Sequence, residues 1–396
     1  MTGIEDRLRD ALTAKAETVR DDGEFHLLPA ALGRERRWRA PVAMAAAMAA
    51  VAVGTIVGTR TVAVAPPAPA ARQASPAPYA GPLAPPIKQV WPRAVHEIPV
   101  KGAGDLEFMP EAFVSDRVVV GRGLIRSRLD GIWSYDVGTR AFTRIAPFRG
   151  RAVMDSAPVY GDGYVAWPAL NERMTEVWAV PVTGGVPRRI ASVPAAMTSE
   201  ASYEGIDLAI ADGMAVWSPS DGGVYRVPLK GGRASLVSGT AGYYLVEWPW
   251  AGRPAKKTMT DAIPRPMEHL KNVVTGALSD AAAPAGRSAW QDCGVSWCFN
   301  GAEAWRRDGT GLRALPGIAR GVLYSGRFVL LSQKDRDGRR ANAVYDIATG
   351  RAGLLFLTPA RPGDKAYPTL YLQEGVMRYR TGRGTQVVVD LTAAGR

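Results

Sequence analysis

The chain has 396 residues, with 49 Lys and Arg against 37 Asp and Glu, a formal net charge of +12 at pH 7. Hydrophobic residues make up 47% of it, which excludes a collagen-like or mainly disordered protein. Its two cysteines exclude a scaffold held by many disulfides and a zinc site of four thiolates. The basic residues do not cluster on any one expected element, so no nucleic-acid partner is expected.

In the N-terminal segment, residues 1–40, apolar residues recur at helical spacing from Ile4 to Val19 among charged neighbours. Such a short amphipathic helix is stable only when it packs on something. Two interpretations stay open: a solvated or membrane-surface helix, or a cytoplasmic helix that docks a partner such as a sigma factor. Zinc-binding anti-sigma factors carry paired cysteines in such a segment. This one has His26 and no cysteine, so zinc binding of that kind is not expected.

An uncharged, Ala-rich run covers residues 41–59. A helix of that length spans about 28 Å, close to the ~30 Å hydrocarbon core of a bilayer. Because tilting would let the span continue through Ala65, we expect one transmembrane helix within residues 41–65. Ala63-Val64-Ala65 also resembles a signal-peptidase site, so cleavage after Ala65 is an open alternative.

The flanks of this run predict its orientation. Basic residues and one tryptophan precede the run, and a single arginine follows it; these expected membrane-flanking residues are Arg34, Arg36, Arg37, Trp38, Arg39 and Arg60. A basic cluster on the N-terminal side predicts a cytoplasmic N-terminus and a C-terminal domain outside the cytoplasm. Residues 66–92 are rich in Pro and Ala and are expected to form an extended, semi-rigid linker.

From residue 93 to residue 396 the chain consists of short apolar runs separated by Gly, Asp and Pro. Related strand–turn–strand units begin at Gly131 (GIWSYDVGTRAFTRIA), Glu176 (EVWAVPVTGGVPRRIA) and Gly223 (GVYRVPLKGGRASLVS), and looser copies follow. Further strands introduced by Asp-Gly precede several of them. Short strands repeated every 40–45 residues or so predict an all-β fold, a β-propeller of four-stranded blades. Seven units predict seven blades, and six is the alternative because residues 243–283 are irregular.

The two ends of this region predict how the ring closes. The last unit, TQVVVDL from Thr385, has no outer strand after it, while the run VHEIPV at residues 95–100 has no neighbour at the other end. We expect the N-terminal run to complete the last blade, because closure removes the open sheet edges.

These units carry a resemblance. Strand–Asp/Thr-Gly–Arg–strand repeats behind one hydrophobic span resemble the WD40-like or TolB-like propellers of bacterial cell-envelope proteins, over roughly residues 93–396. The Gly-His and Trp-Asp pairs of eukaryotic WD40 repeats are missing, which places the resemblance with the looser group. The layout as a whole is similar to that of membrane proteins of high-GC Gram-positive bacteria. The resemblance implies a domain that binds a protein or an envelope component rather than one that catalyses.

Two pairs of residues are candidates for specific roles. Cys293 and Cys298 lie five apart in DCGVSWC, where a hairpin would bring them into disulfide range; two buried thiols are the alternative. Trp248 and Trp250 interrupt the rhythm of the repeat and are candidate ligand contacts. The aromatic residues at equivalent strand positions are expected to pack between blades instead.

No motif selects a catalytic residue, a cofactor or a metal ligand. The sequence has no G-x-S-x-G and no P-loop, and Lys334–Gly338 lacks most ligands of a calcium loop and is expected to be a hairpin turn. The expected function is therefore a membrane-anchored, extracytoplasmic propeller that binds or scaffolds without catalysis. A propeller hydrolase or lyase with a central site is the alternative from a different class.

Overall fold

The computed structural model describes residues 81–148, 157–171, 174–194, 207–219, 222–254, 267–287, 290–357, 370–373, 375–381 and 384–396. The expected cytoplasmic helix, the membrane span and its flanking residues all lie outside this part of the chain. Within the described part, no helix is both long enough and apolar enough to cross a membrane.

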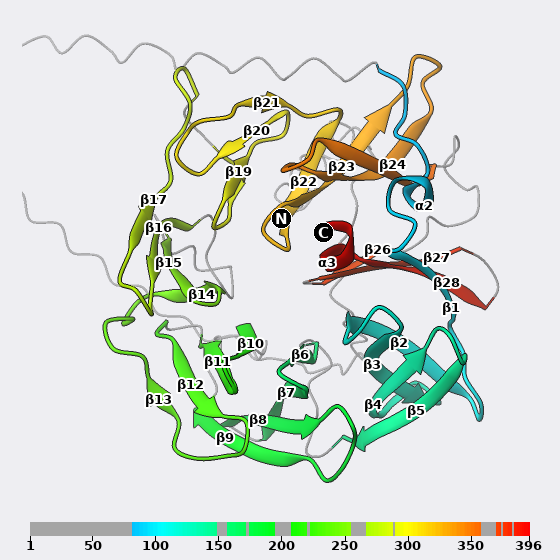
Figure 1. Ribbon diagram of the computed structural model, residues 1–396, viewed down its shortest axis with the longest axis vertical. Coiled ribbons are helices and arrows are strands. Elements are labelled where there is room, and N and C mark those ends of the chain that lie inside the picture. The colour runs from blue at the N-terminus through cyan, green and yellow to red at the C-terminus, as the bar shows by residue number, and fades with distance from the viewer. Residues whose placement is uncertain are drawn as a thin grey trace, which may run out of the picture. The chain divides into compact units, whose positions relative to one another are not determined.

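The repeats fold into seven four-stranded antiparallel sheets in the described part of the chain, arranged as a ring (Figure 1). The all-β propeller with seven blades is confirmed, and the six-blade alternative is wrong. Blades 1 to 3 consist of β2 (Leu106–Phe113), β3 (Val118–Ile125), β4 (Arg128–Asp136) and β5 (Ala141–Pro147); β6 (Val159–Gly161), β7 (Tyr164–Asn171), β8 (Met174–Pro181) and β9 (Arg188–Pro194); and β10 (Asp207–Ala211), β11 (Met214–Ser218), β12 (Tyr225–Pro228) and β13 (Ser235–Leu236).

The remaining blades include the irregular region and the closure. Blades 4 to 7 consist of β14 (Tyr244–Glu247), β15 (Trp250–Pro254), β16 (Met267–Asn272) and β17 (Leu278–Asp280); β18 (Asp292–Cys293), β19 (Trp297–Phe299), β20 (Glu303–Arg306) and β21 (Arg313–Ala314); β22 (Ile318–Tyr324), β23 (Phe328–Lys334), β24 (Arg340–Asp346) and β25 (Arg351–Leu357); and β26 (Leu370–Gln373), β27 (Val376–Arg380), β28 (Thr385–Asp390) and β1 (Val95–Pro99). Two short helices, α2 (Ile87–Val90) and α3 (Leu391–Ala394), complete the described elements.

The Asp-Gly pairs form the tight turns between the first and second strands of two blades. Asp162 and Gly163 both have positive φ, at 50° and 75°, and connect Gly161 to its strand partner Tyr164. Asp212 and Gly213 do the same in the next blade, at 55° and 70°. Two consecutive residues with positive φ twist the hairpin in the sense that β-strands require, which favours Asp-Gly at this position.

A second kind of turn joins the third and fourth strands. Asp136 accepts hydrogen bonds from the backbone N–H of Gly138 and Thr139 through Oδ1, at 2.7 and 2.9 Å. These N–H groups hold the pKa of the Asp136 carboxyl below its usual value. Asn272 makes the equivalent pair of bonds in blade 4. In these turns the Asp or Asn side chain therefore accepts the hydrogen bonds that the backbone N–H groups would otherwise make with water.

The N-terminal strand closes the ring as expected. β1 pairs antiparallel with β28, from Val95 opposite Val389 to Pro99 opposite Thr385. The last blade therefore takes its outer strand from the start of the domain and its other three from the end. This closure leaves no blade of the described ring with a missing strand.

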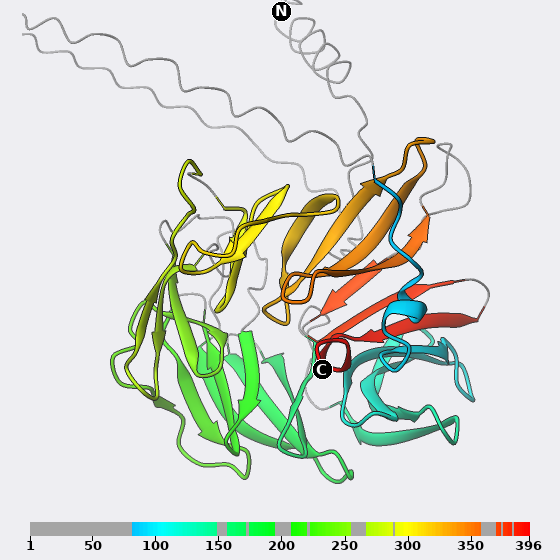
Figure 2. The ribbon, with the colours of Figure 1, turned by 45° about the horizontal axis from the view of Figure 1, so that its top comes forward.

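Part of the expected linker belongs to the propeller. In Figures 1 and 2 the blue segment that contains α2 lies beside blades 6 and 7. Ile87 and Trp91 are buried at 3% and 5% exposure, and the backbone of Pro85 accepts a hydrogen bond from Leu354 of β25. The proline-rich composition of residues 66–92 indicated a spacer throughout, but the apolar residues near its end pack on the domain.

Most of the hydrophobic core lies between consecutive blades. Between blades 2 and 3, for example, Val177 packs with Trp217, and both are fully buried. Trp167 fills the equivalent gap between blades 1 and 2. Trp167 and Trp217 therefore pack between blades, as expected, whereas Trp305 packs with the cysteines of its own blade. The first strands face the ring axis.

Candidate functional site

The first strands of the seven blades enclose a cavity of about 620 Å³. Each blade of the described ring contributes to the wall, from Ala112 in blade 1 to Leu372 in blade 7, and most of the lining is apolar. Ligand sites of small molecules usually have volumes of about 300–1,000 Å³ and apolar walls with a few polar groups. This cavity therefore has the size to enclose a small molecule or a side chain of a larger ligand.

Asp390 lines the cavity where β28 ends and α3 begins. It is 3% exposed, and its Oδ1 caps the helix by accepting hydrogen bonds from the N–H groups of Thr392 and Ala393 at 2.9 and 3.1 Å. Within the described part of the chain its Oδ2 makes no hydrogen bond. Figure 1 shows α3 toward the middle of the ring.

His96 on β1 does not neutralise Asp390. Burial lowers the pKa of His96 below its ordinary value of 6.5, although the charge of Asp390 raises it in part. The imidazole is therefore mainly neutral near pH 7. Asp390 has no ion-pair partner among the described residues.

Glu247 and Trp248 lie at the end of the first strand of blade 4. The indole Nε1 of Trp248 donates a hydrogen bond of 2.9 Å to Oδ2 of Asp212 in the neighbouring blade, which fixes the ring at the cavity wall. Glu247 also lines the cavity. Its Oε2 approaches Gly326 of blade 6 closely: a Cβ placed on that glycine would lie 3.1 Å from the oxygen. Burial within the ring raises the pKa of Glu247 above its usual value.

The third carboxylate of the cavity, Glu111, already has cationic neighbours. A β-bulge between Pro110 and Ala112 places Glu111 as the extra residue of β2. Arg122 Nε donates to its Oε1 at 2.6 Å, with both side chains almost fully buried. Arg378 of blade 7 is buried nearby; its desolvation lowers its pKa to about 10, and the charge of Glu111 opposes that shift.

The charge of the lining differs in sign from the charge of the chain. Among the described residues that line the cavity, the charged ones are Glu111, Glu247 and Asp390, and none is Lys, Arg or His. The chain as a whole carries +12. Because Glu111 is paired with Arg122, the negative potential of the cavity comes mainly from the other two carboxylates.

The structure separates the two tryptophans that sequence analysis selected together. Trp248 lines the cavity, whereas Trp250 lies on β15, pairs with Asn272 and packs partly buried beside Tyr244 and Met267. Only the first of them is placed to meet a ligand in the cavity. Ligand contact by either residue stays a prediction.

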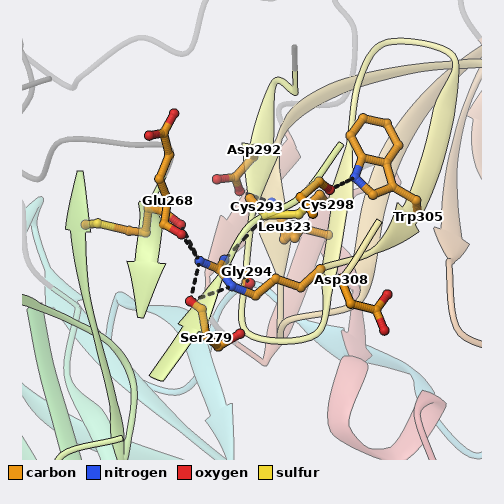
Figure 3. Close-up of a disulfide and its surroundings, with 12 residues drawn as sticks. Glu268, Ser279, Asp292, Cys293, Gly294, Cys298, Trp305, Asp308 and Leu323 are labelled. Atoms are coloured by element: carbon orange, nitrogen blue, oxygen red, sulfur yellow. Dashed lines mark hydrogen bonds between the residues drawn. A yellow bond between two sulfur atoms is a disulfide. The ribbon is translucent and has the colours of Figure 1, made fainter. Parts of the chain in front are cut away.

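The two cysteines face each other on β18 and β19 and are joined by a disulfide in the structure (Figure 3). Both are almost completely buried, at 1% and 0% exposure for Cys293 and Cys298, and Trp305 completes the same small apolar cluster. The disulfide lies in the body of blade 5. Gly294, which directly follows Cys293, lines the cavity.

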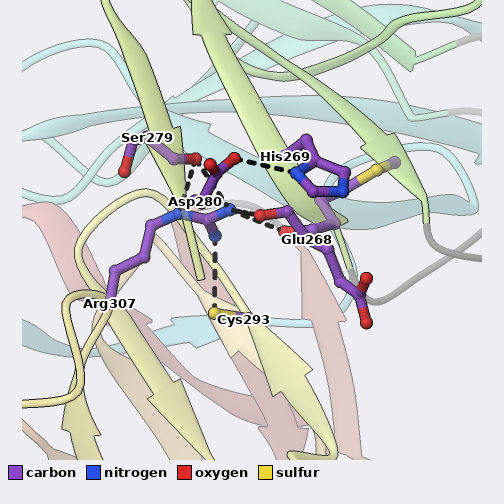
Figure 4. A network of polar contacts seen from close by, with 7 residues as sticks. Glu268, His269, Ser279, Asp280, Cys293 and Arg307 are labelled. Carbon is purple, nitrogen blue, oxygen red and sulfur yellow. Dashed lines mark hydrogen bonds and ion pairs between the residues drawn. The ribbon is translucent and has the colours of Figure 1, made fainter. Parts of the chain in front are cut away.

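Arg307 forms a polar network between blades 4 and 5 (Figure 4). Its guanidinium is 3% exposed and donates to the backbone carbonyls of Met267, Glu268 and Gly294, at 2.9, 2.5 and 2.9 Å. It also donates to the Sγ of Cys293 at 3.4 Å. Burial lowers the pKa of Arg307 to about 10, which leaves the group charged at neutral pH.

Sequence reasoning missed Glu247, Asp390 and Arg307. Glu247 directly precedes Trp248, so the break in the repeat that singled out the tryptophan was also the signal for its neighbour. Asp390 could have been found as an N-cap residue, but its position at the ring axis depends on the closure of the last blade. Among the described residues, no cluster of three or more His, Cys, Asp or Glu is arranged to hold a metal ion.

No protein-family model and no curated protein sequence matches the chain. Solved structures with related folds include YCF48 from Cyanidioschyzon merolae, which is 10% identical with a TM-score of 0.39 and is matched over 76% of this chain and 99% of that one. TolB from Acinetobacter baumannii is 11% identical with a TM-score of 0.27, over 69% of this chain and 64% of that one. A puromycin hydrolase is 15% identical with a TM-score of 0.35, over 71% of this chain.

The chain spans only 43% of the hydrolase chain and less than two thirds of TolB. The sheet topology and the cavity define the class of the protein: an all-β, seven-bladed propeller with an acidic and apolar cavity at its axis.

Proposed function

We propose that the protein is anchored by one membrane helix within residues 41–65, has its N-terminus in the cytoplasm, and presents the propeller outside as a non-catalytic binding module. The expected ligand is a protein or an envelope component. The observation that supports binding is the cavity, whose wall draws on all seven blades and combines apolar side chains with two carboxylates that lack an ion-pair partner in the described part of the chain.

The anchoring part of the proposal is supported by the uncharged run of residues 41–59 and the basic cluster before it. Protease added to intact cells should cut within residues 66–80, ahead of the segment that packs on the propeller, and should release a folded fragment. An N-terminal tag should become accessible only after the cells are permeabilised. Release without protease would favour cleavage after Ala65, and a tag accessible on intact cells would overturn the orientation.

The binding part is tested by crosslinking from the propeller on whole cells. A photoreactive residue in place of Leu372, which lines the cavity, should capture a defined partner. The same residue in place of Val274, which is 66% exposed and lies outside the cavity, is the matched control. Identical capture from both positions, or none from either, would contradict binding at the ring axis.

The role of residues 1–40 as a docking helix for a cytoplasmic partner such as a sigma factor stays a prediction. A pulldown with this segment, compared with one in which Leu8 and Leu12 are replaced by Asp, tests it directly. Loss of a specific partner with the substituted segment is the expected result if the apolar stripe is a docking face.

A further inference from the structure

We propose that the cavity binds a protonated amine on an apolar stem, such as a lysine side chain of the protein ligand, and that Glu247 and Asp390 provide the negative charge. This inference rests on the proposed binding function and names the chemistry of its ligand.

The charge of the cavity selects a cation. Its described lining contains three carboxylates and no basic side chain, in a chain that is otherwise basic. An anionic ligand would therefore be repelled and also desolvated, and low-dielectric walls strengthen that penalty. A cationic ligand would instead be attracted by the carboxylates, and the same low-dielectric walls would strengthen that attraction.

The two carboxylates are only partly compensated by the protein. Asp390 is 97% buried, uses Oδ1 to cap α3 and makes no hydrogen bond through Oδ2 in the described part of the chain. A bound N–H group would give this oxygen a hydrogen-bond donor. Glu247 makes no hydrogen bond or ion pair with a described residue, and burial alone raises its pKa.

The wall beside the carboxylates suits an alkyl stem better than a small hydrated cation. Leu245, Val322 and Leu323 line it, and the Trp248 ring is fixed there by its bond to Asp212. An indole face attracts an ammonium group as well as an alkyl chain. A metal ion would need several oxygen ligands close together, and the described residues offer no such cluster.

The test compares two ligands that share the same alkyl stem, of which only one carries a charge at its end. The probe is N-acetyl-lysine N-methylamide, titrated calorimetrically into the full chain, and the reference is the same compound acetylated on its Nε, which keeps the stem and removes the charge. We expect the lysine amide to bind about tenfold or more tightly than the acetylated form, since a charge-assisted hydrogen bond contributes that much. Equal binding of the two compounds, or no binding of either, would overturn the proposal.

Matched variants assign the effect to the cavity. Glu247→Gln keeps the shape and hydrogen-bonding size of the side chain and should weaken the lysine amide about tenfold or more. Glu268→Gln removes the same charge from a residue outside the cavity lining and should leave the affinity unchanged. Thermal unfolding of each variant establishes that it is folded, and Asp390→Asn provides a second test in which the helix cap is largely retained. Equal effects of Glu247→Gln and Glu268→Gln would show that the charge acts non-specifically.

This outcome can be separated from the proposed function. If whole-cell crosslinking captures a defined partner at the cavity but the lysine amide does not bind, the inferred ligand chemistry is wrong and the binding function stands. If the lysine amide binds and no partner is captured, the cavity chemistry stands and the proposed function fails.

Discussion

The interface between blades 6 and 7 and the interface between blades 4 and 5 are held in different ways. At the first, fifteen buried apolar residues of the described chain form one cluster, which includes Phe328, Tyr379 and the N-terminal Ile87 and Trp91. At the second, the corresponding cluster of buried residues in the described part of the chain consists of Tyr244, Met267 and Leu270. We call the interface between blades 6 and 7 the apolar joint. The interface between blades 4 and 5, where other interactions must replace apolar burial, is called the polar joint.

Strand length explains the difference. All four strands of blade 6 have seven residues, whereas those of blade 5 have two to four. Short strands bury less side-chain area and leave more backbone groups without a partner in the sheet. In blade 5 the buried Arg307 donates to the backbone carbonyls of Met267 and Glu268 in blade 4, and the disulfide ties β18 to β19.

Removal of residues 81–100 is expected to have the largest effect on stability, because it deletes buried side chains from the apolar joint. It deletes β1 and the buried side chains of Ile87, Trp91 and Ile98. Burial of three such side chains contributes roughly 5 kcal/mol or more, comparable with the whole stability of many domains. A chain that begins at Lys101 should therefore melt far below one that begins at Gly81, or fail to fold, in thermal unfolding followed by circular dichroism.

The two chains share every residue of blades 1 to 6, so their difference isolates the closure. Equal melting temperatures would mean that β1 and the α2 segment do not stabilise the ring. A partial drop in melting temperature, with near-native cooperativity, would mean that the apolar joint stabilises the ring less than its buried side chains indicate.

Arg307→Met tests the polar joint. The substitution keeps an unbranched side chain but leaves the carbonyls of Met267, Glu268 and Gly294 without this donor in a buried site. A buried acceptor that loses its donor costs about 1–3 kcal/mol. We expect a large drop in the midpoint of urea unfolding for this variant.

The neighbouring arginine provides the control. Arg306 is exposed and lies over the Trp297 ring with 5.0 Å between Cζ and the centroid. Arg306→Met should cost about 1 kcal/mol or less, because a cation–π contact at an exposed site is weak. If the two variants were equally stable, the polar network would not be what holds blades 4 and 5 together.

The sequence could reveal the fold far better than these joints. Alternating strands, Asp-Gly turns and the unpaired runs at Val95 and Thr385 are local signals, and they predicted blades and closure. Arg306 and Arg307 are adjacent and identical in type, so only the three-dimensional packing decides which one is buried. The cavity residues were hidden for the same reason: Glu247 and Asp390 are 143 positions apart, roughly three and a half repeats of this propeller.

Reduction of the disulfide should weaken the polar joint by a smaller amount. A crosslink between residues five apart closes a short loop, which the chain-entropy account values at about 2 kcal/mol. Urea unfolding in the presence of a dithiol should therefore occur at a lower midpoint than in its absence. Mass spectrometry under denaturing conditions, with and without reductant, would show the gain of two hydrogens.

The variant in which Cys293 and Cys298 are both replaced by Ala controls for other effects of the reductant, and its midpoint should not move when the dithiol is added. A wild-type protein isolated with two free thiols would contradict the disulfide. An unchanged midpoint on reduction would mean that the short strands of blade 5 need no covalent support.

The smallest predicted effect is a pH dependence with opposite signs on two glutamates. Burial raises the folded-state pKa of Glu247, so the stability that its protonation contributes is present below the ordinary pKa of Glu and is lost as pH rises through the raised value. The hydrogen bond from Arg287 lowers the pKa of Glu303 at the polar joint, so the stability that its ionised form contributes is present above the ordinary pKa and is lost as pH falls through the lowered value.

Near pH 7 we therefore expect Glu247→Gln to raise the melting temperature and Glu303→Gln to lower it, and both differences should shrink toward pH 3. Melting curves of the three proteins between pH 3 and pH 8 measure this. A change of the same sign for both variants would mean that their carboxylates experience the same surroundings, which is incompatible with an uncompensated acid at the ring axis.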